Sequence, residues 1–246
     1  MLRQLGYELV SIEGRGTLEG VLANAKRCGL KPDLVIDVGA GRGDFAKRAA
    51  AIFPDAALLL VEPLSEFTQA LNDLCATLPQ ARWIAAVASD QTSSMTLNVH
   101  PDLFGSSLLL EDECTNVNGT PRSVSSITLD SQIIEAHAIV LKIDVQGAEL
   151  KVLAGAADVL KRAELVILET SFFHFFPQGP LFDQVVSFML DQGFVLYDLF
   201  GLSHRPLDGA LAQVDAVFAK REGTLRSLHH YATPEQRAKL TRRLRS

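Results

Sequence analysis

The chain has few cysteines, no long apolar run and no excess of positive charge. Its three cysteines lie far apart among 246 residues and form no CxxC pair, so neither a disulfide framework nor a zinc knuckle is expected. No stretch approaches the ~18 apolar residues of a membrane-spanning helix, and the first residues contain no clean apolar signal segment. A net charge of −6 argues against bulk nucleic-acid binding. These absences predict a cytoplasmic protein with no nucleic-acid partner and no membrane span.

The composition suits a single domain over residues 1–246, because 48% of the residues are hydrophobic and only 21% are charged. We expect four parts: a helical cover over 1–30, a core over 33–220, a long insert over 91–135 and a basic helix over 221–246. From Lys220 onward the chain holds eight Lys or Arg and two Asp or Glu. This last part either contacts a polyanion or a membrane or, as we favour, is a solvated helix.

Apolar runs and helical spacings alternate along the chain. Strands are expected at residues 34–38, 57–61, 82–87, 138–143, 164–169, 194–199 and 213–219. Helices are expected after Thr17 and at 43–53, 65–78, 149–160 and 181–191. Within the insert we expect a strand at 95–99 and a loop from 104 to 122. This alternation predicts an α/β fold whose mostly parallel sheet is covered by helices on both faces.

The most informative motif is a glycine turn between an apolar run and an acid. Residues 37–43 read Asp-Val-Gly-Ala-Gly-Arg-Gly, and Glu62 ends the next apolar run. Gly39, Gly41 and Gly43 let a ligand lie against the backbone, and Glu62 can accept hydrogen bonds from both hydroxyls of a ribose. The pairing predicts a nucleotide-binding crevice.

The glycine spacing indicates which nucleotide binds there. A dinucleotide fingerprint has its third glycine one position after Gly43, where this chain has Asp44. An acid at the start of a helix would repel a pyrophosphate. Asp37 suits a ligand with a cationic end, and S-adenosylmethionine carries an adenosine, an amino acid and a sulfonium but no phosphate. We therefore expect S-adenosylmethionine as the cofactor, with a dinucleotide or a purely structural turn as alternatives.

Polar residues follow three further strands, and ligands of open α/β sheets bind at such carboxyl ends. Ser89 and Asp90 follow the third strand, where they could meet the adenine amino group. Asp144 ends the fourth strand and would face the methionine part of the cofactor or the acceptor. Glu169 ends the fifth strand, and His174 follows it in an aromatic loop.

Several segments resemble the FkbM-type family of class I S-adenosylmethionine-dependent methyltransferases. They run in order over roughly residues 33–220 and are residues 35–43, 61–63, 128–130, 141–149 and 215–218. The Leu129-Asp130 pair, upstream of Lys-Ile-Asp-Val-x-Gly-x-Glu, is more specific than the glycine turn. The chain departs from the family at Gln146, where glutamate is common, which affects one possible acceptor contact.

The resemblance implies a Rossmann-like, doubly wound sheet of seven strands with the last strand antiparallel. It also implies O-methylation of a small-molecule hydroxyl, often on a sugar or another secondary metabolite. By the same resemblance, Asp37, Gly39 and Gly41 line the methionine and ribose, Glu62 holds the ribose, and Asp144 lies near the reacting centre. The rest of the expected cofactor site is Ala40, Gly43, Pro63, Ser89 and Asp90.

An alcohol acceptor must lose a proton, and the candidate bases are Asp144, His174 and Glu169, of which we assign the role to Asp144. Four phenylalanines surround His174, so a packed lid histidine is the alternative there, and Asp144 could instead cap the helix expected at 149–160. Asp144 and Glu169 could also supply two ligands to Mg²⁺, but no third ligand is evident and we expect no metal. Lys142 could pair with Asp144 or Glu149, but we favour the interpretation that its neighbours in the strand only bury its stem.

Two other classes of protein remain to be weighed. A catalytically silent S-adenosylmethionine-binding or regulatory protein would keep the glycines and Glu62 but would need no acceptor pocket. The aromatic loop 172–176 and the segment 91–135 could cover an acceptor, which favours an enzyme. A nicotinamide oxidoreductase is disfavoured by Asp44. The sequence leaves open the acceptor's identity and whether the chain forms a homo-oligomer.

Overall fold

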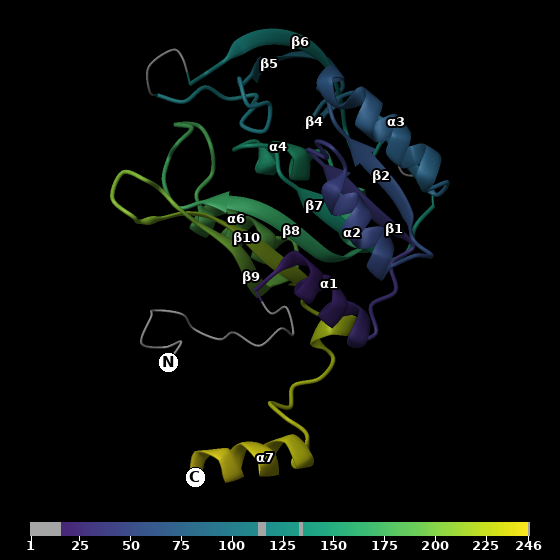
Figure 1. The fold of residues 1–246 in the computed structure, drawn as a ribbon, viewed down its shortest axis with the longest axis vertical. Coiled ribbons are helices and arrows are strands. Elements are labelled where there is room, and N and C mark those ends of the chain that lie inside the picture. The colour runs from purple at the N-terminus through teal and green to yellow at the C-terminus, as the bar shows by residue number, and fades with distance from the viewer. Residues whose placement is uncertain (1–15, 113–116, 133–134, 246) are drawn as a thin grey trace, which may run out of the picture.

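A computed structural model describes residues 16–112, 117–132 and 135–245 of the chain, with side chains described through Arg242. Its main sheet is built from β1 (Leu34–Val38), β2 (Ala57–Val61), β3 (Ala81–Ile84), β7 (Ile139–Ile143), β8 (Ala163–Ser171), β9 (Phe194–His204) and β10 (Leu211–Lys220). The strand order is β3-β2-β1-β7-β8-β10-β9 (Figure 1). Only β10 runs antiparallel to its neighbours β8 and β9. The predicted seven-stranded sheet with its last strand antiparallel is confirmed.

Helices cover both faces of this sheet, as expected. One face carries α1 (Leu18–Arg27), α2 (Asp44–Ile52) and α3 (Thr68–Thr77), and the other carries α4 (Glu149–Ala154), α5 (Ala157–Arg162) and α6 (Phe182–Asp191). Successive residues of β1 serve the two faces, with Val35 in the first apolar cluster and Ile36 in the second. Burying each such side chain stabilises the fold by about 1.5–3 kcal/mol. The central strands are therefore mostly apolar, with Asp37 in β1 and Lys142 in β7 as exceptions, because neither face of the sheet meets water.

The expected helix 149–160 is two helices, because the chain bends at Gly155 between α4 and α5. A Cβ atom on Gly155 would overlap the backbone carbonyl oxygen of Ser89. The start of α5 is capped from outside, since the Asp130 carboxylate accepts hydrogen bonds from the backbone N–H groups of Asp158 and Val159 at 3.0 Å. The specific Leu-Asp pair of the sequence thus has a structural role.

The expected strand 82–87 is also divided, because β3 ends at Ile84 and the next strand belongs to a second sheet. That sheet has the order β4-β6-β5, from β4 (Val87–Ala88), β5 (Ser94–Val99) and β6 (Thr120–Ile127). The strand expected at 95–99 is confirmed, whereas the loop expected through residue 122 ends where β6 begins. In Figure 1, β5 and β6 lie beyond the carboxyl ends of the main strands. The described part of the insert is therefore folded and lies above the expected site.

The helix α7 (Pro234–Arg245) lies apart from both sheets (Figure 1). Thr233 and Gln236 form a reciprocal cap, in which the Gln236 N–H donates to Thr233 Oγ1 at 3.2 Å and the Thr233 N–H donates to Gln236 Oε1 at 2.9 Å. Its described side chains are exposed. None of the helices in the described ranges has the length and apolar character to cross a bilayer. The cytoplasmic location and the role of this basic helix stay predictions.

Candidate active site

A cavity of about 260 Å³ lies at the carboxyl ends of the main strands. Its walls include six of the residues predicted from the sequence: Gly39, Gly41, Glu62, Pro63, Asp144 and Glu169. The first four follow β1 and β2, whereas Asp144 follows β7 and Glu169 belongs to β8. One cavity therefore joins the glycine turn to two acids that lie one and two strands away.

The glycine turn brings backbone close to backbone. Gly39 has a φ of +76°, and a Cβ atom there would overlap the carbonyl oxygen of Asp144. Gly41 has a φ of +53°, which L side chains rarely adopt, and its N–H donates to Glu62 Oε2 at 2.8 Å. Gly39 is thus needed to bring the turn after β1 against the end of β7.

The carboxylate of Glu62 is buried in the cavity wall. Burial raises its pKa, and backbone N–H groups of Leu64 and Gly41 oppose that rise by donating to its two oxygens, each at 2.8 Å. Each carboxylate oxygen can accept a second hydrogen bond. Glu62 is therefore held in place with acceptor capacity to spare, which fits the ribose hydroxyls of an adenosine.

The apolar walls of the cavity were missed by the sequence analysis. They come from the segment after β2, from β4 and from the folded insert: Leu64, Phe67, Ala86, Val87, Ala88, Leu97, Leu103, Phe104 and Leu108. The ring of Phe104 lies 5.5 Å from that of Phe67 between centroids, 5.9 Å from the Arg42 guanidinium carbon and over Gly41. Phe104 is nevertheless 58% exposed. These side chains form an apolar slot beside Glu62, which suits an adenine.

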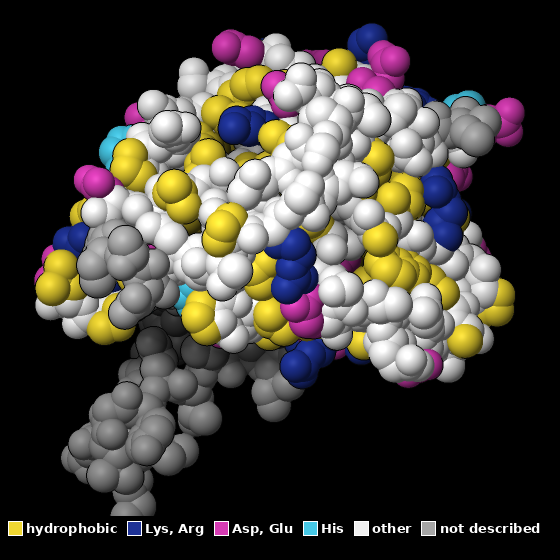
Figure 2. Space-filling view, turned by 90° about the horizontal axis from the view of Figure 1, so that it is seen from above, with side chains coloured by type: hydrophobic (Ala, Val, Ile, Leu, Met, Phe, Trp, Pro, Cys, Tyr) yellow, Lys and Arg dark blue, Asp and Glu magenta, His cyan; other side chains and the backbone are white. Residues whose placement is uncertain are grey.

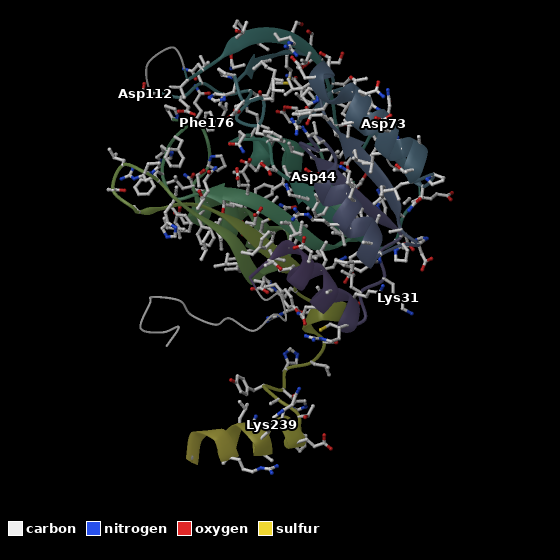
Figure 3. All side chains as sticks on the ribbon, in the orientation of Figure 1. Lys31, Asp44, Asp73, Asp112, Phe176 and Lys239 are labelled. Carbon is white, nitrogen blue, oxygen red and sulfur yellow. The ribbon has the colours of Figure 1, made fainter. Side chains whose placement is uncertain are left out.

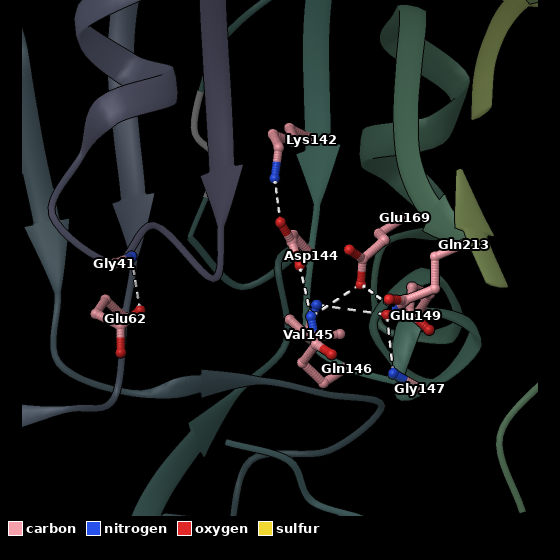
Figure 4. Close-up of polar contacts among 10 residues, drawn as sticks. All are labelled: Gly41, Glu62, Lys142, Asp144, Val145, Gln146, Gly147, Glu149, Glu169 and Gln213. Carbon is pink, nitrogen blue, oxygen red and sulfur yellow. Dashed lines mark hydrogen bonds and ion pairs between the residues drawn. The ribbon is translucent and has the colours of Figure 1, made fainter. Parts of the chain in front are cut away.

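Two acids at the other end of the cavity share one amide (Figure 4). The Gln146 Nε2 group donates to Asp144 Oδ1 at 3.1 Å and to Glu169 Oε2 at 2.8 Å. Asp144 Oδ2 accepts from Lys142 Nζ at 2.8 Å, and Glu169 Oε2 also accepts from Gln213 Nε2 at 3.0 Å. Of the possibilities considered for Lys142, the pairing with Asp144 is present, so the side chain does more than bury its stem.

Burial has the largest effect on the pKa values of Glu169 and Lys142 at this end of the cavity. It raises the pKa of Glu169 to about 8, with the charges of Asp144, Glu149 and Asp215 adding to the rise. Burial opposes the charging of Lys142, but the surrounding carboxylates outweigh it and hold the Lys142 pKa above its ordinary value. A carboxyl with a pKa near 8 can exchange a proton near neutral pH.

The loop between Asp144 and α4 is fixed by Glu149, whose pKa burial raises to about 7. Its Oε1 accepts from the N–H groups of Gly147 at 3.1 Å and Val145 at 3.4 Å. In the described contacts, no backbone N–H group of this loop or of α4 donates to the Asp144 carboxylate. The alternative that Asp144 caps the helix therefore has no support from these contacts.

Asp37 is fully buried below the cavity wall, and neither of its carboxylate oxygens has a hydrogen-bond partner among the described residues. Burial raises its pKa to about 7, although the neighbouring Lys142 pulls it down. The side chain is not among those that line the cavity. Its predicted contact with the methionine part of the cofactor stays a prediction.

Five other predicted residues also lie outside the cavity lining: Ala40, Gly43, Ser89, Asp90 and His174. Ser89 is buried and its hydroxyl donates to Asp90 Oδ1 at 3.0 Å, whereas His174 is exposed in the aromatic loop. In that loop it is Phe176 that packs on Gly147, between the sheet and the insert (Figure 3). Roles for these five residues stay predictions.

A metal centre finds no support in the described ranges, where no three His, Cys, Asp or Glu side chains gather as a ligand set. Cys28 and Cys75 are free thiols, and Cys114 lies outside the described residues. The expectation that no metal takes part stays a prediction.

Comparison with known proteins was made on sequence and on structure. Residues 37–196 match the family described as the methyltransferase FkbM domain, and the comparison with curated proteins finds no match. Among solved structures, a methyltransferase FkbM from Methylobacillus flagellatus is 15% identical with a TM-score of 0.48, over 75% of this chain and 43% of that one. Magnesium protoporphyrin IX methyltransferase from Synechocystis, with bound S-adenosylmethionine, is 12% identical with a TM-score of 0.46, over 89% and 88%.

The strand order and the glycine turn define a Rossmann-like methyltransferase fold. The chain belongs to the FkbM methyltransferase domain family, whose members depend on S-adenosylmethionine. It spans less than half the length of the Methylobacillus structure, and no substrate or site residue is transferred from either solved protein. The residues present fit the cofactor, because Glu62 and the apolar slot suit an adenosine and the glycine turn leaves backbone bare beside them.

Proposed function

We propose that this protein is an S-adenosylmethionine-dependent O-methyltransferase that acts on a hydroxyl of a small molecule, such as a sugar or another secondary metabolite. One observation carries the proposal: Glu169, a carboxyl with a pKa near 8, lines the same cavity as Glu62 and the glycine turn. A general base works best when its pKa lies near the working pH. A site that only held the cofactor would need no proton acceptor in this cavity.

The residues divide the work between the two ends of the cavity. Glu62, Gly39, Gly41 and the apolar slot would hold the adenosine of the cofactor. When bound, S-adenosylmethionine supplies a methyl group whose carbon–sulfur bond breaks with both electrons going to sulfur, as the acceptor oxygen forms the new bond. Glu169 takes the proton from the acceptor hydroxyl, and its orientation is set by the two amides that donate to it. Alignment of the reactants is the larger part of such catalysis.

A small acceptor also suits the surface around the cavity. The walls contributed by the insert are mostly apolar and include Leu103, Phe104 and Leu108. On the face shown in Figure 2, Lys and Arg side chains lie in separate places and form no continuous basic patch. The phosphates of a nucleic acid would require such a patch.

The test uses the full chain with radiolabelled S-adenosylmethionine and a panel of hydroxylated sugars, phenols and polyketides, each paired with an amine analogue. We expect transfer to a hydroxyl, and we expect Glu169→Gln to slow it about 10²–10⁴-fold while cofactor binding is retained. Asp144→Asn and His174→Ala, run in parallel, test the rival bases.

Three outcomes would count against the proposal. Transfer only to amines would replace O-methylation, and tight cofactor binding without transfer across the panel would favour the silent binding protein. Full activity in Glu169→Gln with loss in His174→Ala would move the base to His174.

A further inference from the structure

Gln146 lies between the two acids of the cavity, and both N–H groups of its side-chain amide are hydrogen-bonded to them. Its side-chain amide has two N–H bonds, and they point to Asp144 at 3.1 Å and to Glu169 at 2.8 Å (Figure 4). We propose that Gln146 is a positioning residue, whose neutral amide holds Asp144 and Glu169 side by side and controls when Glu169 takes a proton. The catalytic meaning of this proposal rests on the proposed function.

The backbone conformation at position 146 is one that favours glycine, yet the chain has a glutamine there. Its φ of +54° lies in the left-handed region, which a residue with a Cβ atom seldom adopts, and the next residue, Gly147, has a φ of +92°. A glycine would fit both positions without strain. Strained positions persist where the surroundings hold them, and here the buried Ser107 hydroxyl donates to the Gln146 carbonyl oxygen at 2.6 Å. The insert thereby fixes the residue that orders the two acids.

The charge of the side chain matters as much as its shape. The charged groups that face Glu169 come from β7, the loop and helix after it, and β10: Lys142, Asp144, Glu149 and Asp215. Three of these four are acids, so an additional carboxylate at position 146 would lie within hydrogen-bond distance of two others. A neutral donor removes that repulsion and favours the ionised form of Glu169. Glutamine supplies both effects with one group.

The test is a pH titration of the full chain without cofactor or acceptor, by NMR of its ¹³C-labelled Asp and Glu carboxyl carbons. The Glu169 signal is identified by its loss in Glu169→Gln. In Gln146→Met, which keeps the length but removes both donors, we expect the Glu169 midpoint to rise by about 1 pH unit. In Gln146→Glu we expect a larger rise, because a carboxyl then meets two others.

Gln213 provides the matched control, because its amide donates to Glu169 but makes no described bond to Asp144. Gln213→Met removes a donor from Glu169 alone and leaves the Gln146 amide bonded to both acids, so it should raise the Glu169 midpoint by less than Gln146→Met does. Gln146→Gly relieves the left-handed backbone and removes the amide, so it keeps the test available if the longer variants fold poorly. It should shift the Glu169 midpoint as Gln146→Met does.

An unmoved Glu169 midpoint in Gln146→Met and Gln146→Gly would overturn the proposal. Because this titration involves no methyl transfer, absence of transfer from S-adenosylmethionine would defeat the proposed function and leave the titration result standing. Once an acceptor is known, the acid limb of the kcat/KM profile should move to higher pH in Gln146→Met by the same amount as the midpoint. A limb that stays in place while the midpoint moves would show that Gln146 does not act through the base.

Discussion

At the scale of single residues, Glu62 offers the sharpest test of cofactor binding. Its two oxygens are held by backbone N–H groups and lie in the cavity wall. In Glu62→Gln, an N–H group of the new amide would oppose one of those donors, and an acceptor for ribose would be lost. We expect binding of S-adenosylhomocysteine, measured by calorimetry, to weaken by about 1–3 kcal/mol.

A nearby acid serves as the control for Glu62. Glu66 forms an ion pair with Arg122 at 2.7 Å and does not line the cavity. Glu66→Gln should bind S-adenosylhomocysteine with unchanged affinity. Equal affinities in the two variants would show that Glu62 does not contact the ribose.

The residues at strand ends were predictable because a strand, a glycine turn and an acid are local patterns. Gly39, Gly41, Glu62, Asp144 and Glu169 all reach one cavity for this reason. The apolar walls were not predictable, because Phe104 and its neighbours meet the glycine turn across more than sixty positions of sequence and only through the fold of the insert. Gln146 was visible in the sequence as a departure from the family, but its two bonds depend on how β7 and β8 pair.

At the scale of elements, the loop over residues 100–108 is expected to move. Ligand pockets usually measure about 300–1,000 Å³, and this cavity of about 260 Å³ is smaller. The movable wall is Phe104, which is 58% exposed and lies in a loop closed by short local bonds, such as that from the Gly105 N–H to Asp102 Oδ1 at 2.9 Å. Binding of the cofactor should therefore displace and then order this loop.

Hydrogen exchange tests this expectation. Without ligand, amides in residues 100–108 and in the aromatic loop 172–176 should exchange faster than those of β1, and S-adenosylhomocysteine should slow the first loop about tenfold or more. The exposed helix α7 should exchange equally with and without ligand. Exchange as slow in both loops as in β1, with no ligand present, would show that neither acts as a lid.

Some ends of the helices and strands are set by neighbouring residues and could be predicted, whereas others are set by contacts that are distant in sequence. The ends of α1 and α7 follow from the caps at Thr17 and Thr233, which the sequence displays. The break between α4 and α5 does not, because it depends on the approach of Gly155 to Ser89. In the second sheet, β5 was expected but β6 was not, since β6 pairs with β5 across the insert and its many polar residues indicate little burial.

At the scale of the whole molecule, two buried and two partly buried acids contribute to the dependence of stability on pH. Burial raises the pKa of each, to about 7 for Asp37 and Glu149, about 8 for Glu169 and about 6 for Asp215. An acid with a higher pKa in the folded protein binds more protons there than in the unfolded chain. Between the two pKa values, the free energy of unfolding therefore falls as pH rises. We expect the protein without cofactor to be more stable near pH 5 than near pH 8, by urea denaturation.

The variant Asp37→Asn isolates one of these acids, because Asp37 has no hydrogen-bond partner in the described structure and does not line the cavity. Its ordinary pKa of 3.8 and its folded pKa of about 7 define the window in which it destabilises the fold. An amide of the same size carries no charge, so the variant should lose less stability between pH 5 and pH 8, by about 1–4 kcal/mol relative to the parent chain. Glu66→Gln is the control, since Arg122 lowers the Glu66 pKa to about 2 and its titration ends below this range. A parent chain whose free energy of unfolding rises from pH 5 to pH 8, or an Asp37→Asn variant with the parent's slope, would show that the buried carboxyl is not protonated in the fold.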